Sequence, residues 1–286
     1  MEKNRVLELE KTALEVRKDV VRMIGLSKAP SLASSLSVVD ILVFLYFSAM
    51  SVRPEEPAWP DRDRAVLGMQ DCSPALYATL AREGFFDREE LWSYQRLGAM
   101  LQGTLEPRRT PGVDSPGGIP GLGIGMAAGI ALGCRMRKSR SRVFCVVGES
   151  ELGLGAAWES VLAAAARKQG NLCVIVGVGG EFPAGQAHVA ASAEALEKRF
   201  SSFGWQVTLA DGHDFNSLCR AVHETGEKAS VPVAVLAKTR WGQGVAFSER
   251  DSGAAAVLPN RERVEKALLE LEKAGKTLEE EYHDEP

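Results

Sequence analysis

The sequence predicts an α/β fold, with a parallel sheet covered by helices on both faces. In the second half of the chain, short apolar β-branched segments alternate with segments of helical periodicity. Parallel strands need a crossover between them, so this alternation favours a parallel sheet that is buried on both sides. A chain of 286 residues, 45% hydrophobic and 25% charged, is long enough to bury such a core.

The first half of the chain is predicted to be helical and irregular. Leu7, Leu14, Val21 and Ile24 recur at helical spacing, which predicts an amphipathic helix ending near Gly25. The segments that follow are apolar helices or loops rich in Pro and Gly: a buried helix at 36–50, a loop at 53–63, short helices at 73–83 and 87–96, a long loop at 101–120 and a helix of small residues at 121–137. The last of these is too apolar for an exposed helix, so we expect it to lie at an interface.

The second half carries the strands. Strands are predicted at 142–147, 172–178, 205–209 and 231–237, with helices at 155–168, 193–203 and 215–228. A charged helix is predicted at 261–273, followed from Thr277 by a frayed acidic tail. We therefore divide the chain into a domain over 1–260 and a charged C-terminal helix with its tail over 261–286.

Composition excludes several functional classes. The net charge of −4 argues against nucleic acid as a partner, because phosphate binding needs a basic surface. The five cysteines form no C-x-x-C pair, which argues against structural zinc. No apolar run reaches the roughly 18 residues that a membrane span needs, and the charged N-terminus does not resemble a signal peptide. We expect a cytoplasmic protein without a membrane partner.

Ligands of open parallel sheets bind at the carboxyl ends of the strands. The predicted strands end at 148–151, 177–180, 211–214 and 238–240. Gly148 would let a ligand approach the backbone, and the N-terminus of the helix that follows favours an anion. A phosphate-bearing cofactor suits this geometry, although a capped turn without a ligand explains the same residues.

Eight segments resemble, in order, the N-terminal half of transketolases. They are WPDRDRAVL, CSPALYATLAREGFF, PGVDSPGG, GLGIGMAAGIALG, VVGESELGLGAAWES, NLCVIVGVGG, FGWQVTLADGHDF and KTRWGQGVAF. The resemblance runs from about Leu14 to Pro259 and implies the thiamine-diphosphate-binding fold, as its diphosphate-binding domain. It also implies thiamine diphosphate and magnesium as cofactors. A partner half, separate in split transketolases, would hold the aminopyrimidine and supply the activating glutamate.

The resemblance places the cofactor on residues that depart from the family pattern. The cofactor-binding positions are Gly121, Gly123, Gly148, Glu149, Ser150, Gly179 and Glu181. The family metal ligands fall at Glu149, where an Asp is usual, at Gly179, where an Asn is usual, and at the carbonyl of Glu181. Glycine has no side-chain oxygen, so a divalent cation would lose one ligand.

The catalytic histidines implied by the resemblance are also replaced. Their positions hold Ser31, Asp71, Thr104 and Ala255. The four histidines of the chain lie elsewhere, at His188, His213, His223 and His283. Histidine is hard to replace as an acid–base group near neutral pH. In addition, a family glutamate at the subunit interface has become Leu154.

Together these replacements predict a degenerate, non-catalytic transketolase-like subunit that acts as a scaffold or regulator. It would form a homodimer, assemble with a C-terminal-half subunit, or do both. One alternative is an active split transketolase that transfers a two-carbon ketol unit, with Glu149 as metal ligand and Glu151 or the Glu181 carbonyl compensating. Another is a pocket reused for a different phosphate compound.

Overall fold

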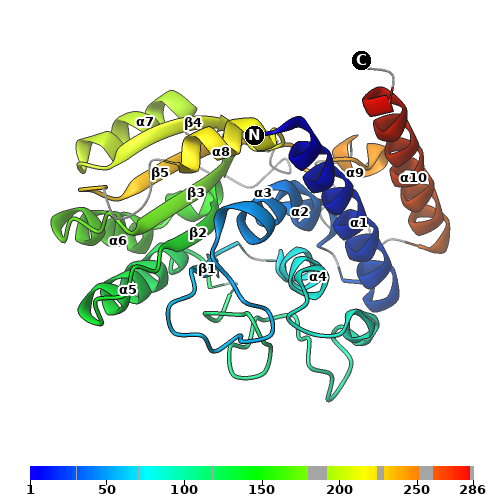
Figure 1. Ribbon diagram of the computed structural model, residues 1–286, viewed down its shortest axis with the longest axis horizontal. Helices are drawn as coiled ribbons and strands as arrows, with labels where there is room; N and C mark the ends of the chain where they lie inside the picture. Colours follow the sequence, from blue (N-terminus) through cyan, green and yellow to red (C-terminus); the bar gives the residue numbers. More distant parts are fainter. Residues whose placement is uncertain are drawn as a thin grey trace.

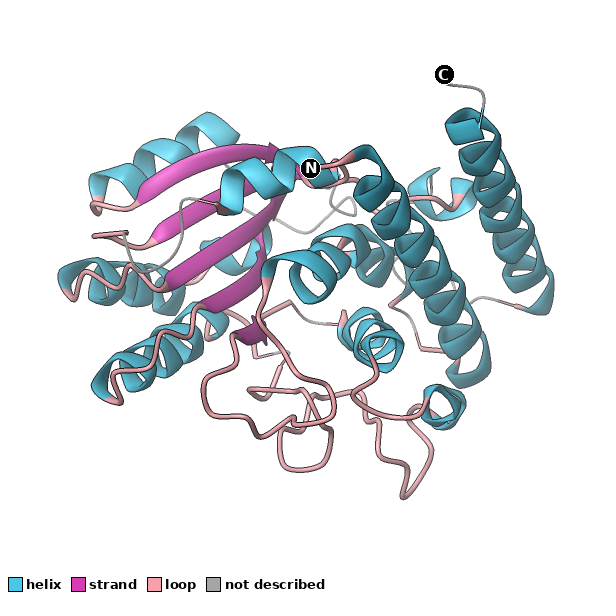
Figure 2. Ribbon diagram, in the orientation of Figure 1, coloured by secondary structure: helices cyan, strands magenta, loops and turns pink. Residues whose placement is uncertain are grey.

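The computed structural model describes residues 1–29, 31–69, 71–117, 119–179, 192–223, 229–250 and 260–283. Within these ranges, the centre of the molecule is a sheet of five strands in the order β1-β2-β3-β5-β4 (Figure 1; Figure 2, magenta). The strands are β1 (Arg64–Leu67), β2 (Val143–Gly148), β3 (Leu172–Val178), β4 (Gln206–Asp211) and β5 (Val233–Lys238). Neighbouring strands are parallel throughout, which confirms the predicted sheet.

The central strands are apolar along their length because helices cover both faces of the sheet. Every residue of β2 is buried, and β3 is buried except at Gly177. The register pairs Gly148 with Gly177, and Val178 with Lys238. The carboxyl ends of β2, β3 and β5 therefore lie together along one edge, where the ligand is expected.

One face of the sheet is covered by α5 (Gly123–Met136), α6 (Gly155–Ala166) and α7 (Ala193–Ser202). These helices share a hydrophobic core with the strands, to which Ile124, Val161 and Phe200 contribute fully buried side chains. The helices α5 and α6 lie side by side (Figure 1). A Cβ atom at Gly125 would lie 2.8 Å from Ser160 Oγ, so glycine permits this close packing.

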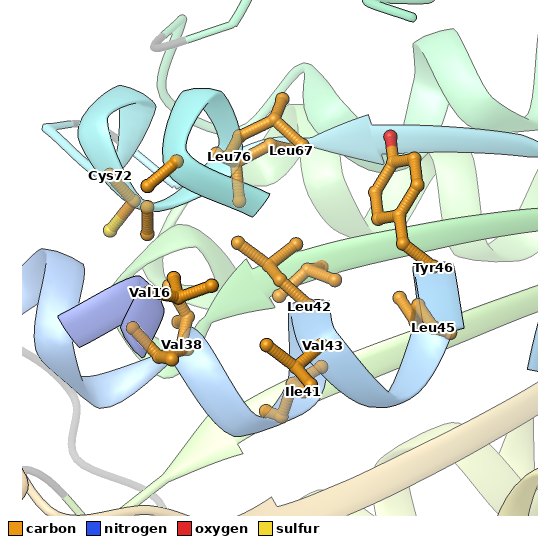
Figure 3. Close-up of a cluster of buried hydrophobic side chains, with 14 of the residues drawn as sticks. Val16, Val38, Ile41, Leu42, Val43, Leu45, Tyr46, Leu67, Cys72 and Leu76 are labelled. Atoms are coloured by element: carbon orange, nitrogen blue, oxygen red, sulfur yellow. The ribbon is translucent and has the colours of Figure 1, made fainter. Parts of the chain in front are cut away.

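The other face carries more than one layer of helices. Two short helices, α3 (Val39–Phe44) and α8 (Phe215–Val222), contribute to the core on this side of the sheet. Three more elements pack around them: α1 (Lys3–Ser27), α2 (Leu32–Ser37) and α4 (Ser73–Glu83). Figure 3 shows Val16 of α1, Leu42 of α3 and Leu76 of α4 gathered in one buried cluster.

The C-terminal helix is longer than predicted. Helix α10 (Arg261–His283) lies alongside α1 (Figure 1), so the prediction of a frayed tail is wrong for residues 277–283. Leu278 and Tyr282 continue the helical spacing of Leu271, and Lys11 pairs with Glu279 at 3.1 Å. These contacts with α1 extend the helix into the acidic segment.

Two other parts of the fold differ from what the sequence predicts. The predicted helix at 36–50 is three elements, since α2 and α3 are followed by a π-helical segment, η1 (Leu45–Ala49). Ser37 Oγ donates to the Ser34 carbonyl at 2.7 Å, and such bonds compete with regular helical geometry. Strand β1 was not predicted because its four residues are too few to show a period.

The remaining elements are short: η2 (Arg88–Ser93), η3 (Glu149–Gly153) and α9 (Ala246–Arg250). The last part of the helix predicted at 215–228 lies outside the described residues. In the ranges that the structure covers, no helix is both long and apolar enough to cross a bilayer.

Candidate functional site

At Gly148, two side chains of the protein lie over the edge of the sheet that the strand ends form. A Cβ atom placed on this buried glycine would lie 3.5 Å from Met69 Cε and 3.5 Å from Ser150 Oγ. Met69 follows β1 and Ser150 follows β2, so neighbouring strand ends supply the two side chains. The backbone surface that a diphosphate would approach at Gly148 is therefore in contact with Met69 and Ser150.

Glu149 and Gly179, two of the predicted metal-ligand positions, bind each other. Glu149 Oε2 accepts the backbone N–H of Gly179 at 3.0 Å, across the ends of β2 and β3. Gly179 has φ +101°, a conformation that favours glycine. The sequence places both residues at the site but gives no sign of this contact, which the extra methylene of Glu149 makes possible.

Glu151, which is expected to compensate as a metal ligand in an active enzyme, binds a backbone donor of this chain in the structure. Its side chain is buried and accepts the backbone N–H of Gly121. Burial raises the pKa of this carboxyl, and the bond from Gly121 only partly offsets the effect. Gly121 has φ +75° and lies against Leu154. The hydrogen bond from Gly121 to Glu151 therefore connects the segment before α5 to η3.

Ser31 and Asp71, two of the four predicted histidine positions, lie close together. Ser34 Oγ is 3.1 Å from the Ser31 carbonyl and 3.5 Å from the Asp71 carbonyl. Ser31 is 4% exposed, and its hydroxyl has no hydrogen-bond partner among the described residues. Partial burial raises the pKa of Asp71. Neither side chain carries an imidazole, the group whose ordinary pKa lies near neutral pH.

Thr104 is exposed on the loop beside the start of α4. Its neighbour Gly103 accepts a hydrogen bond from Ser73 Oγ at 2.9 Å. Ala255 and Glu181, the remaining predicted positions, lie outside the described residues. The remaining glycine of the predicted set, Gly123, packs against β1 and its loop, since a Cβ there would lie 2.7 Å from Gly68 Cα.

These residues do not fit a divalent cation that bridges to a diphosphate. Magnesium requires near-octahedral oxygen ligands at about 2.0–2.1 Å. Gly179 offers no side-chain oxygen, and Glu149 is engaged with its backbone. Over the described ranges, no group of three or more His, Cys, Asp or Glu side chains is placed to hold a metal ion.

Comparison with known proteins shows a family match over most of the chain and two relatives of similar length. Residues 16–268 match the family described as "Transketolase, thiamine diphosphate binding domain". The chain is 32% identical to 6-deoxy-6-sulfo-D-fructose transketolase subunit SqwG of Clostridium sp. (strain MSTE9), over 94% of the chain and 98% of that protein. It is 29% identical to one of the subunits of the apulose-4-phosphate transketolase of Phocaeicola vulgatus, over 96% of the chain and 97% of that protein.

Solved structures show the same fold. The crystal structure of transketolase from Campylobacter jejuni superposes with a TM-score of 0.75 at 21% identity. The match covers 99% of this chain and 49% of that transketolase. The chain thus spans about half the length of the solved transketolase that it matches.

Proposed function

Because the chain belongs to the transketolase family, through its thiamine diphosphate binding domain, we propose that it is the N-terminal subunit of a split, transketolase-like assembly that has lost ordinary ketol transfer. Its role is to scaffold or regulate a C-terminal-half partner. The observation that carries the proposal is the contact between Glu149 and Gly179, which joins two family ligand positions to each other. The replaced histidine positions at Ser31 and Asp71 lie at the same end of the sheet and support the same conclusion.

The outer face of α5 and α6 supports a protein partner. On α5, Leu122, Met126, Gly129, Gly133 and Met136 follow one another at helical spacing, and Met136 is 77% exposed. A Cβ atom at Gly129 or Gly133 would meet nothing within 4 Å, so the space beside both glycines is open. Exposed apolar surface of this kind is typical of an interface.

Neighbouring residues extend this apolar face. Leu154, at the start of α6, and Leu162, further along it, are 41% and 54% exposed. On the opposite side of the sheet, a second layer of helices covers α3. We infer that the α5–α6 face receives the partner half, which agrees with the interface expected from the sequence. The relatives named as transketolase subunits support such a partner.

The test is ketol transfer by the assembled complex. The tagged chain is purified with its natural partner and supplied with thiamine diphosphate, magnesium and a range of ketose phosphate donors. The proposal predicts no transfer above that of the partner alone. Transfer that requires this chain would contradict it.

An active split transketolase remains the second candidate, because Glu149 keeps a carboxylate at the end of β2. In such an enzyme, Glu149 would turn from Gly179 toward a metal ion. The variant Glu149→Gln separates the two candidates: it retains an oxygen that accepts the Gly179 N–H but removes the charge that a cation needs. Loss of metal-dependent thiamine diphosphate binding in this variant would favour the active enzyme. Our proposal predicts no metal-dependent binding of thiamine diphosphate in the wild type or in the Glu149→Gln variant.

A further inference from the structure

A buried polar network joins four elements at the strand-end edge. Asp40, on α3, is 5% exposed. Its Oδ2 accepts hydrogen bonds from the Arg17 guanidinium on α1 and from Nδ1 of His213, the latter at 2.6 Å. His213 lies in the turn between β4 and α8. Burial alone would raise the pKa of Asp40, but Arg17 and His213 hold it below its ordinary value, so this carboxylate stays ionised.

The second ring nitrogen of His213 holds a different part of the chain. Nε2 accepts the backbone N–H of Arg240 at 2.8 Å. A nitrogen that accepts carries no proton, so these two contacts assign the neutral ring with its hydrogen on Nδ1. The ring therefore connects Asp40 to the turn that follows β5.

This turn, residues 239–244, is fixed at two further points. Arg17 Nε donates to the Gln243 carbonyl at 3.2 Å, and Gly242 N–H donates to the Ala33 carbonyl at 3.0 Å. Two of these contacts come from side chains that bind Asp40, namely Arg17 and His213. Asp40 therefore links two of the points at which the turn is attached.

The turn borders the candidate site. Thr239 N–H donates to the Val178 carbonyl at 2.8 Å, which places the start of the turn against the end of β3. The Thr239 carbonyl lies 3.5 Å from the position of a Cβ on Gly179. A shift of residues 239–244 would therefore change the surroundings of Gly179 and of its bond to Glu149.

We propose that His213 is a positioning residue that holds the turn 239–244 against the end of β3 while its ring is neutral, and releases the turn when the ring is protonated. A proton added at Nε2 would face the N–H of Arg240, so two donors would oppose each other and the hydrogen bond would be lost. This role of His213 does not depend on whether the site carries out ketol transfer.

Several charged groups surround the ring. Asp40 on α3 is already paired with Arg17 on α1. Asp211, at the end of β4, accepts the His213 backbone N–H at 2.9 Å, and Asp214 caps α8. From the side of β5, Lys238 and the Arg240 side chain are exposed, and Arg240 lies 3.9 Å from Glu249 of α9.

Hydrogen exchange of single backbone amides, followed by NMR between pH 8 and pH 5, tests the proposal in the full chain. After correction for intrinsic exchange, the Arg240 amide should lose at least tenfold in protection as the pH falls. The Gly212 amide, which donates to the carbonyl of Lys238 in β5, serves as the control and should keep its protection. Arg240 protection that is independent of pH in the wild type would overturn the proposal.

Two variants form a matched pair. The side-chain amide of His213→Asn can replace Nδ1 but not Nε2, so Arg240 should be unprotected at every pH. The Oε1 atom of His213→Gln can replace Nε2 as acceptor and cannot be protonated in this range, so Arg240 protection should not vary with pH. Wild-type protection at Arg240 in the Asn variant would contradict the role of the ring, whereas a purely structural role would give both variants the same protection.

Discussion

At the scale of single residues, two carboxylates of the candidate site bind backbone donors of this chain. Glu149, where the resemblance implies an Asp, accepts the N–H of Gly179 at 3.0 Å. Glu151 accepts the backbone N–H of Gly121. In both cases a carboxylate satisfies a backbone donor of this chain, so the described loops are held in place by their own side chains.

One residue outside the site gives a pH-dependent prediction. Glu83 ends α4 and is half-buried, and desolvation raises its pKa to about 7, with Arg5 only partly opposing the shift. Because the pKa of Glu83 is raised in the folded chain, the contribution of this group to stability is greatest at low pH. The contribution falls as the pH rises from about 4.5 through 7, because the unfolded chain ionises first. Since the group is partly exposed, the cost of its charge above pH 7 is about 1 kcal/mol.

The substitution Glu83→Gln removes this cost. We expect its melting temperature at pH 8 to exceed that of the wild type by about 2 °C, with a clearly smaller gain at pH 5. Melting followed by circular dichroism at the two pH values checks this. Glu272→Gln, at an exposed position on α10, is the control and should change neither value. An equal gain at both pH values would show that charge at Glu83 is not the cause.

At the scale of elements, the sequence identifies most of the fold and much less of the site. Periodicity finds β3 and α4 at their observed bounds, because long apolar patterns depend on burial alone. It misses β1 and the breaks in 36–50, which depend on pairing with β2 and on serine side chains. It also places Glu149 and Gly179 at the ends of predicted strands, but not the contact between them, and Asp71 is expected at the site only from the resemblance to transketolases. The bond between Glu149 and Gly179, like that between His213 and Arg240, joins residues far apart in the sequence.

The exposed face of α5 and α6 gives a prediction at this scale. Gly129→Arg places a long charged side chain where a glycine has no neighbour within 4 Å. Because Arg has a higher helix propensity than Gly, the isolated chain should be as stable as the wild type or more stable by up to about 1 kcal/mol. Binding of the C-terminal-half partner should fall at least tenfold, as measured by co-purification and sedimentation.

The matched control for this variant is Glu272→Arg, which adds an arginine on the exposed side of α10. It should leave partner binding unchanged. If Gly129→Arg also binds the partner normally, the docking face lies elsewhere on the molecule.

At the scale of the whole molecule, the fold of the domain and its ability to bind the cofactor are separate properties. The sheet, its helices and the superposition on a solved transketolase at a TM-score of 0.75 describe an intact domain. Glu149 and Gly179, two of the positions at which we propose that family ligands are replaced, follow the neighbouring strands β2 and β3 at one edge of that domain. Under our proposal, the domain keeps the surface that its assembly needs, although its strand-end edge no longer binds the cofactor.

The most direct test of lost cofactor binding is the thiamine diphosphate content of the native assembly. The tagged chain is purified from its own cells in buffer containing magnesium, the material is denatured, and the released thiamine diphosphate is quantified against the amount of chain. An intact transketolase carried through the same steps controls for loss of the cofactor. We predict that a C-terminal-half partner co-purifies and that no thiamine diphosphate is measurable. About one cofactor per chain would contradict this prediction and identify an active enzyme with rebuilt metal ligation.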